Sequence, residues 1–142
     1  MSESSGADIP PAPISVGIGI ISRNGLYLVR QRPKGTVYEG YWEFPGGKCE
    51  PEETSESAMI RECFEEIGME VIPIRLRKVI EHTYPHGAVR LHFFDGEPAL
   101  PDAQPAPGTG FRWLPLADLA SLRFPEANSI ILEELLAEAN SR

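Results

Sequence analysis

The sequence predicts a single α/β domain in which a mixed β-sheet lies between helices. Short runs of β-branched and aromatic residues come first and alternate with two segments of helical periodicity. The chain has 142 residues, of which 42% are hydrophobic, and this supports one core rather than two. Strands and helices in this order favour a layered α/β arrangement.

The N-terminal half of the chain is expected to form a tail, a hairpin and a helix. Residues 1–13 are rich in Ser, Gly and Pro, so we expect them to be disordered and residues 14–142 to form the domain. Asn24-Gly25 is a strong signal for a two-residue hairpin turn. Strands are expected over residues 14–22, 26–31 and 41–44, with a loop over 33–40 and a helix over 54–67 that ends at Gly68.

The C-terminal half predicts a second pair of strands and a final helix. The strands are joined by the turn Pro85-His86-Gly87. The Pro-rich segment 99–110 either covers a ligand or connects two elements. Further strands are expected over residues 76–84, 88–95 and 111–114, with a helical turn over 116–121 and an amphipathic helix over 126–139.

The first predicted helix carries three glutamates at positions i, i+3 and i+4, so their carboxylates lie on one face. They are Glu62, Glu65 and Glu66. Like charges at this spacing repel, and a hard divalent cation such as magnesium would remove the conflict. Alternatively, the glutamates form a solvated face in which Arg61 pairs with one of them. The glycine turn at Gly46-Gly47 favours the metal site, because it can bring backbone close to the helix.

The segment around this helix resembles the Nudix box of the Nudix hydrolases. The pattern comprises Gly47, Glu53, Arg61-Glu62, Glu65-Glu66 and Gly68 at the family's spacing. Every fixed position is filled. Only Cys63 departs, since it stands where a larger aliphatic residue is usual, and Cys packs as a small hydrophobe. The resemblance extends from about Ile14 to Leu136 and implies the Nudix-type α/β/α sandwich with a mixed β-sheet.

The resemblance also implies roles for the box residues. The glutamates supply metal ligands or the general base, and which of them deprotonates water is left open. The Gly46 carbonyl is implied as a further ligand, and Asp102 aligns with an acidic residue that joins the metal cluster. Arg61 is expected to pair with Glu53 and hold its orientation. The implied catalytic set is Glu53, Arg61, Glu62, Glu65 and Glu66, and the metal set is Gly46, Glu62, Glu65, Glu66 and Asp102.

Other residues are expected to contact substrate by the same resemblance. Arg32 matches an arginine that contacts phosphate, although a lone strand-end arginine is often a solvated cation. Asn128 matches an asparagine that reads a purine edge with its amide donor and acceptor, or it caps the last helix. The aromatic rings of Phe44 and Phe124 could line a cleft for the base or pack in the core. The substrate set is Arg32, Phe44, Gly47, Lys48, Phe124 and Asn128.

The segments around Trp42 and Phe124 are similar to the MutT-like branch of the family. This resemblance implies a pyrophosphohydrolase that depends on Mg²⁺, with Mn²⁺ as a substitute, and converts a nucleoside triphosphate to the monophosphate and pyrophosphate. Oxidised dGTP (8-oxo-dGTP) is the favoured substrate. The alternatives are a related enzyme acting on pyrimidine triphosphates such as CTP, and a non-catalytic domain that binds nucleotides.

Composition limits the partners and the compartment. The net charge of −8 argues against binding a nucleic-acid polymer. No apolar run reaches membrane-spanning length, and the start lacks the features of a signal peptide. Together with two cysteines of no paired spacing, this predicts a reduced, cytoplasmic monomer or homodimer. The histidines, expected as surface or hydrogen-bonded strand residues rather than zinc ligands, are His82, His86 and His92.

Overall fold

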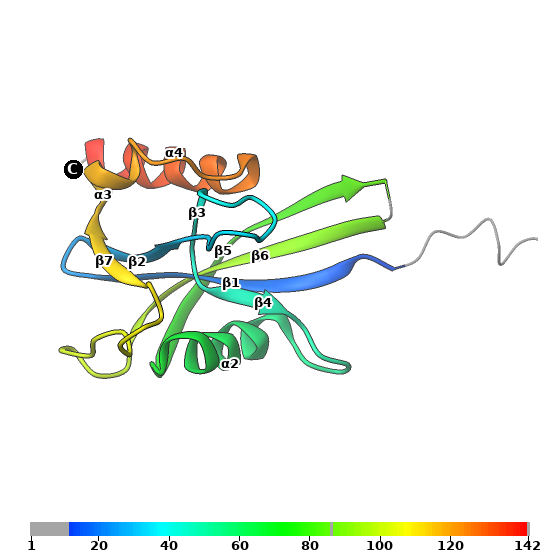
Figure 1. Cartoon of the computed structure of the whole chain (residues 1–142), viewed down its shortest axis with the longest axis horizontal. Coiled ribbons are helices and arrows are strands. Elements are labelled where there is room, and N and C mark those ends of the chain that lie inside the picture. The colour runs from blue at the N-terminus through cyan, green and yellow to red at the C-terminus, as the bar shows by residue number, and fades with distance from the viewer. Residues whose placement is uncertain (1–11, 86, 142) are drawn as a thin grey trace, which may run out of the picture.

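The computed structural model describes residues 12–85 and 87–141, which form three layers (Figure 1). Helix α2 (Ser55–Ile67) lies against one face of the sheet, and α4 (Glu126–Asn140) lies against the other. This confirms the predicted α/β/α sandwich. The tail predicted over residues 1–13 falls outside the described residues except for its last two positions. None of the helices in the described ranges is long and apolar enough to span a membrane.

The sheet is mixed, as predicted. Its main path runs in the order β3-β2-β1-β6-β5, in which β1 and β6 are parallel and the other neighbours are antiparallel. Strand β4 pairs with β1, and β7 pairs with β2. The short helix α3 (Leu116–Leu119) follows β7 in the chain. The strands are β1 (Ile14–Arg23), β2 (Leu26–Gln31), β3 (Trp42–Glu43), β4 (Gly46–Lys48), β5 (Val71–Tyr84), β6 (Gly87–Pro98) and β7 (Arg112–Pro115).

Several boundaries differ from the sequence prediction. Strand β5 begins at Val71 rather than at residue 76, and its register shifts at two places, which breaks the two-residue alternation that reveals a strand. Pro73 is tolerated because β5 is an edge strand. Strand β6 pairs with this longer β5 and therefore continues to Pro98. The two glycines expected in a turn form strand β4 instead, because their backbone pairs with β1.

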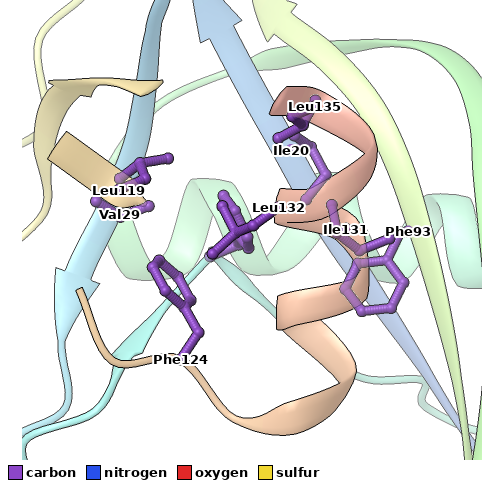
Figure 2. Packing of buried hydrophobic residues seen from close by; sticks show 9 residues of the cluster. Ile20, Val29, Phe93, Leu119, Phe124, Ile131, Leu132 and Leu135 are labelled. Carbon is purple, nitrogen blue, oxygen red and sulfur yellow. The ribbon is translucent and has the colours of Figure 1, made fainter. Parts of the chain in front are cut away.

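Two hydrophobic clusters hold the layers together. The cluster under α4 combines strand, loop and helix residues (Figure 2); among them are Ile20, Val29, Phe93, Leu119, Phe124, Ile131, Leu132 and Leu135. The cluster under α2 includes Cys63, which is fully buried, and burial raises the pKa of its thiol to about 12. Cys63 therefore packs as the small hydrophobe that the sequence predicts.

Two side chains depart from the predicted packing. The helical spacing of apolar residues in α2 predicts that Phe64 faces the sheet, yet this side chain is 59% exposed, and the neighbouring Cys63 is the buried one. Nδ1 of His92 is buried without a hydrogen-bond partner among the described residues, so this imidazole is not fully satisfied. His92 lies on β6, which is between β1 and β5 in the sheet, and the backbone groups of β6 pair with those two strands. His86 lies outside the described residues.

Local signals fix both ends of α2. Thr54 is the N-cap, and its hydroxyl accepts a hydrogen bond from the Ser57 N–H at 3.0 Å. Gly68 ends the helix in the left-handed conformation, with φ of 73°. Between these ends the helix packs directly on β1 at Gly17. A Cβ atom at this position would overlap the Ser55 carbonyl and lie 2.9 Å from the Met59 nitrogen.

We expect Gly17→Ala to destabilise the protein by about 1–3 kcal/mol, because its methyl group would force α2 away from β1. Chemical denaturation measures the change. Ser57→Ala is the control, since this residue of α2 is exposed and keeps the backbone N–H that bonds Thr54, so stability should change by about 0.5 kcal/mol or less. If the Gly17 variant were as stable as the wild type, the close packing of α2 on β1 would be wrong.

Candidate active site

The glycines of β4 bring backbone against the carboxylates of α2. A side chain at Gly47 would overlap the Glu62 carboxylate, and one at Gly46 would overlap the Gly17 carbonyl. The Gly46 N–H donates a hydrogen bond to Glu66 Oε1 at 3.2 Å. The strand and the helix can therefore place a main-chain carbonyl and carboxylates within one small region.

Arg61 lies at the centre of the acidic residues. Its Nε and Nη2 donate to the two carboxylate oxygens of Glu53 at 2.8 and 2.9 Å, which is a bidentate pair. The pairing predicted between these residues is thus present, and it lowers the pKa of Glu53 to about 2. Nη1 of the same guanidinium contacts Glu62 at 3.2 Å and Glu65 at 3.0 Å. Nη2 also donates to the Lys48 carbonyl at 3.1 Å, so Arg61 links α2 to β4.

Glu66 has the opposite electrostatic environment. Burial raises its pKa to about 7, and the nearby charges of Glu62 and Glu43 act in the same direction. The Gly46 N–H and the charge of Arg30 oppose the shift. Arg61 contacts Glu62 and Glu65 but makes no ion pair with Glu66 among the described residues. An ionised Glu66 is therefore a partly desolvated carboxylate that a cation would stabilise.

The donor set suits a hard divalent ion. Carboxylate oxygens of the three helix glutamates and the Gly46 carbonyl are ligands of the type that such ions prefer. Within the described ranges, no three carboxylate, imidazole or thiol groups already converge on one point. Because Arg61 holds Glu62 and Glu65, these two side chains would have to turn away from it in order to join Glu66 around an ion. The site therefore has ligand atoms of the type that a divalent ion prefers, but in this structure they do not surround one point.

A cavity of about 290 Å³ extends from this region toward α4. It brings together four of the predicted site residues, namely Arg32, Phe44, Gly46 and Asn128. A second cavity of about 200 Å³ shares Ile18, Tyr38, Pro125 and Asn128 with the first. The two cavities therefore adjoin and are together called the cleft, and Asn128 lines both of them.

The N-terminus of α4 leaves the Asn128 amide available. The N-cap of the helix is Pro125, so the alternative in which Asn128 caps the helix is wrong. Its backbone N–H donates to the Pro125 carbonyl at 3.0 Å, and within the described part of the chain its side-chain amide makes no hydrogen bond. A half-buried amide in this position can pair with a ligand.

Three predicted site residues lie apart from the cleft or at its margin. Phe124 stacks behind Phe44, with ring centroids 5.3 Å apart, and only 7% of it is exposed, so it packs in the core. Lys48 has an exposed side chain at the end of β4. Asp102 is exposed in a loop whose neighbouring carbonyls, at 101 and 103, accept hydrogen bonds from Arg23.

Arg32 is held firmly rather than solvated. Its Nη1 contacts Glu43 Oε1 at 2.7 Å, and its Nε donates to the Val37 carbonyl at 2.6 Å. Sequence reasoning missed Glu43 and its second partner, Arg30, which contacts Oε2 at 2.7 Å. The available signal was the i, i+2 spacing of the two arginines, which places both on one face of the extended chain at the end of β2. Glu43 lies on β3, 13 residues after Arg30. The sequence alone does not show that β3 pairs with β2 in the register that brings these residues together.

Comparison with known proteins identifies the family. The family model for the NUDIX domain matches residues 17–134. An 8-oxo-dGTP diphosphatase of Escherichia coli K12 is 30% identical over 128 residues, covering 86% of this chain and 95% of that protein. The CTP pyrophosphohydrolase of the same organism is 47% identical over a shorter stretch of 57 residues, covering 40% of this chain and 42% of that protein.

Solved structures agree. A MutT structure, from a study of the Aliivibrio salmonicida and Vibrio cholerae enzymes, superimposes with a TM-score of 0.65 at 33% identity. That match covers 89% of this chain and 99% of the MutT chain. The protein belongs to the Nudix hydrolase family. Nudix hydrolases in general need a divalent metal ion, in agreement with the oxygen-rich donor set described above.

We expect ionisation of Glu66 to destabilise the metal-free protein. A carboxyl pKa raised from 4.5 to about 7 leaves the free energy of unfolding intact below pH 4.5 and lowers it as the pH rises through 7. Glu66→Gln cannot ionise, so in EDTA it should exceed the wild type at pH 8 by about 1–2 kcal/mol after allowance for solvent screening. Urea unfolding at both pH values measures this difference.

Glu133→Gln, on an exposed position of α4, is the control and should follow the wild type. Equal stability of the Glu66 variant and the wild type at both pH values would contradict the buried environment assigned to this carboxylate.

Proposed function

We propose that the protein is a Mg²⁺-dependent nucleoside triphosphate pyrophosphohydrolase that acts on 8-oxo-dGTP. The observation that carries this proposal is that one cavity is lined by both Gly46 and Asn128. One side of it is lined by Gly46, whose N–H donates to Glu66 of α2, and these groups adjoin the carboxylates that suit a metal ion and phosphates. On another side lies the Asn128 amide, which suits a base edge. The similarity to 8-oxo-dGTP diphosphatases over most of the chain supports the same substrate.

The chemistry needs positive charge at an anionic substrate. Bound Mg²⁺, or Mn²⁺ in its place, would neutralise phosphate charge and lower the pKa of a water ligand. The groups that would hold the ion are the carboxylates of Glu62, Glu65 and Glu66 and the Gly46 carbonyl. Arg61 keeps Glu53 ionised and fixes α2 to β4, so that the carboxylates stay oriented. The reaction converts the nucleoside triphosphate to the monophosphate and pyrophosphate.

The base end of the cleft supplies selectivity. Phe44 presents an apolar wall, and it cannot shift easily because Phe124 packs behind it. Asn128 would donate to and accept from the base edge. A polar group that is buried by a ligand and left unpaired costs free energy, so the amide would reject bases of unsuitable pattern.

A second candidate substrate is a pyrimidine triphosphate such as CTP. The local identity to the CTP pyrophosphohydrolase favours it, because that stretch has the higher identity of the two relatives. Hydrolysis of a panel containing 8-oxo-dGTP, dGTP, dCTP and CTP would separate the candidates, with pyrophosphate release as the measurement. A panel without any hydrolysis would favour a domain that binds nucleotides without cleaving them.

We expect Glu66→Gln to lower kcat by on the order of 100-fold or more, because it removes a charged ligand from the metal site. The wild type should lose activity in EDTA and regain it with Mg²⁺ or Mn²⁺. Circular dichroism would show that the variant remains folded, and Glu133→Gln should keep wild-type activity. Full activity of Glu66→Gln would place the metal site elsewhere.

We expect Asn128→Ala to reduce the preference for 8-oxo-dGTP over dGTP by about tenfold or more, since the amide no longer pairs with the base edge. The ratio of kcat/KM values for the two substrates measures this preference. Asn140→Ala, at the other end of the same helix, is the matched control. An unchanged ratio in Asn128→Ala would show that another residue reads the base.

A further inference from the structure

Arg30 is held on three sides between β2 and the loop that precedes β7. Its Nε donates to Glu43 Oε2 at 2.7 Å, and its guanidinium carbon lies 4.8 Å from the centre of the Phe111 ring. Its Nη1 is 3.5 Å from the Thr109 carbonyl. With only 23% of its side chain exposed, the guanidinium has a defined position before any ligand binds.

Arg30 lies next to the end of the cleft that is lined by Gly46. Arg30 is paired with Glu43 in the β2–β3 register, and the two side chains form an ion pair at 2.7 Å. Glu43, its ion-pair partner, lines the cleft together with Gly46. Arg30 therefore lies beside the region to which the proposed function assigns the phosphates.

Arg61, the guanidinium on α2, has few N–H donors left for a ligand. Arg61 uses Nε, Nη1 and Nη2 on carboxylates and on the Lys48 carbonyl. Arg30, in contrast, has no acceptor for Nη2 among the residues that the structure describes. Arg32, which shares Glu43 with Arg30, is in the same condition. Two adjacent guanidinium groups thus keep unused donors on the strand side of the site.

We propose that Arg30 binds the polyphosphate of the nucleotide from the strand side, opposite the carboxylates of α2. This assignment rests on the proposed function. A triphosphate must enter a region lined by several glutamates, and a guanidinium can donate two parallel hydrogen bonds to phosphate oxygens. Because Glu43 and Phe111 already fix the side chain, little conformational entropy is lost on binding.

Affinity measurements on the full-length chain with nucleotides of different phosphate number test the assignment. The probes are a non-hydrolysable dGTP analogue with an α,β-imido bridge, dGMP, and inorganic tripolyphosphate as a competitor, all with Mg²⁺. We expect Arg30→Met to weaken triphosphate-analogue and tripolyphosphate binding by about 10–100-fold, in line with the loss of a charged hydrogen bond. Binding of dGMP should weaken much less.

Two further variants control for folding and charge. Arg30→Lys keeps the charge but loses the planar fork, so it should recover part of the affinity and tests the proposal if Arg30→Met does not fold. Arg90→Met removes an exposed arginine paired with Glu81 at 3.0 Å, and it should bind all probes as the wild type does.

Equal loss of dGMP and triphosphate affinity in either variant, or wild-type affinity in folded Arg30→Met, would overturn the assignment and leave Arg30 as a partner of Glu43 alone. The outcome is separate from that of the proposed function. The substrate panel tests which base the wild type hydrolyses, whereas tripolyphosphate has no base and reports on the phosphate contact.

Discussion

The close approach of one glycine strand to one acidic helix is the constraint on which the rest of the structure depends. Gly17 lets α2 lie on β1, and Gly46 and Gly47 let β4 lie against the helix carboxylates. A methyl group at any of these positions would overlap backbone or a glutamate, so packing density and site geometry have the same cause. The strand supplies the Gly46 N–H to Glu66 and the Lys48 carbonyl to Arg61, where side chains would otherwise separate the two elements.

Helix α2 has two electrostatic halves. On one side Arg61 neutralises Glu53 and links the helix to the Lys48 carbonyl, which gives a fixed scaffold. On the other side Glu66 is partly buried beside like charges, and its pKa is raised to about 7. Burying a carboxylate near others is costly, so such an arrangement is typical of functional sites rather than of stability. The neutralised half can hold the backbone in place while the other half remains available to a cation.

The opposite face of the sheet determines where the far end of the cleft lies. Helix α4 is attached to the edge strand β5 through Arg77, whose side chain is 6% exposed and contacts Asp95 and Glu138, each at 2.7 Å. The apolar cluster under α4 holds the rest of the helix (Figure 2). Asn128 therefore occupies a position set by contacts at the other end of a 15-residue helix. A rigid helix carries that constraint to the cleft.

The sequence by itself determined the acidic helix, its caps, the hairpin and the order of layers, because these features depend on local spacing. Glu62 and Glu66 lie on one face of an α-helix, and Asn24-Gly25 favours a two-residue hairpin turn. It could not determine the β4 pairing, the start of β5, or the burial of Phe124 behind Phe44. Those features depend on strand register and on contacts between distant segments. The same holds for Arg30 and Glu43, since only the pairing of β2 with β3 places them side by side. Tertiary structure decided which predicted residues share the cleft, because a local pattern sets the direction of a side chain but not its distant neighbours.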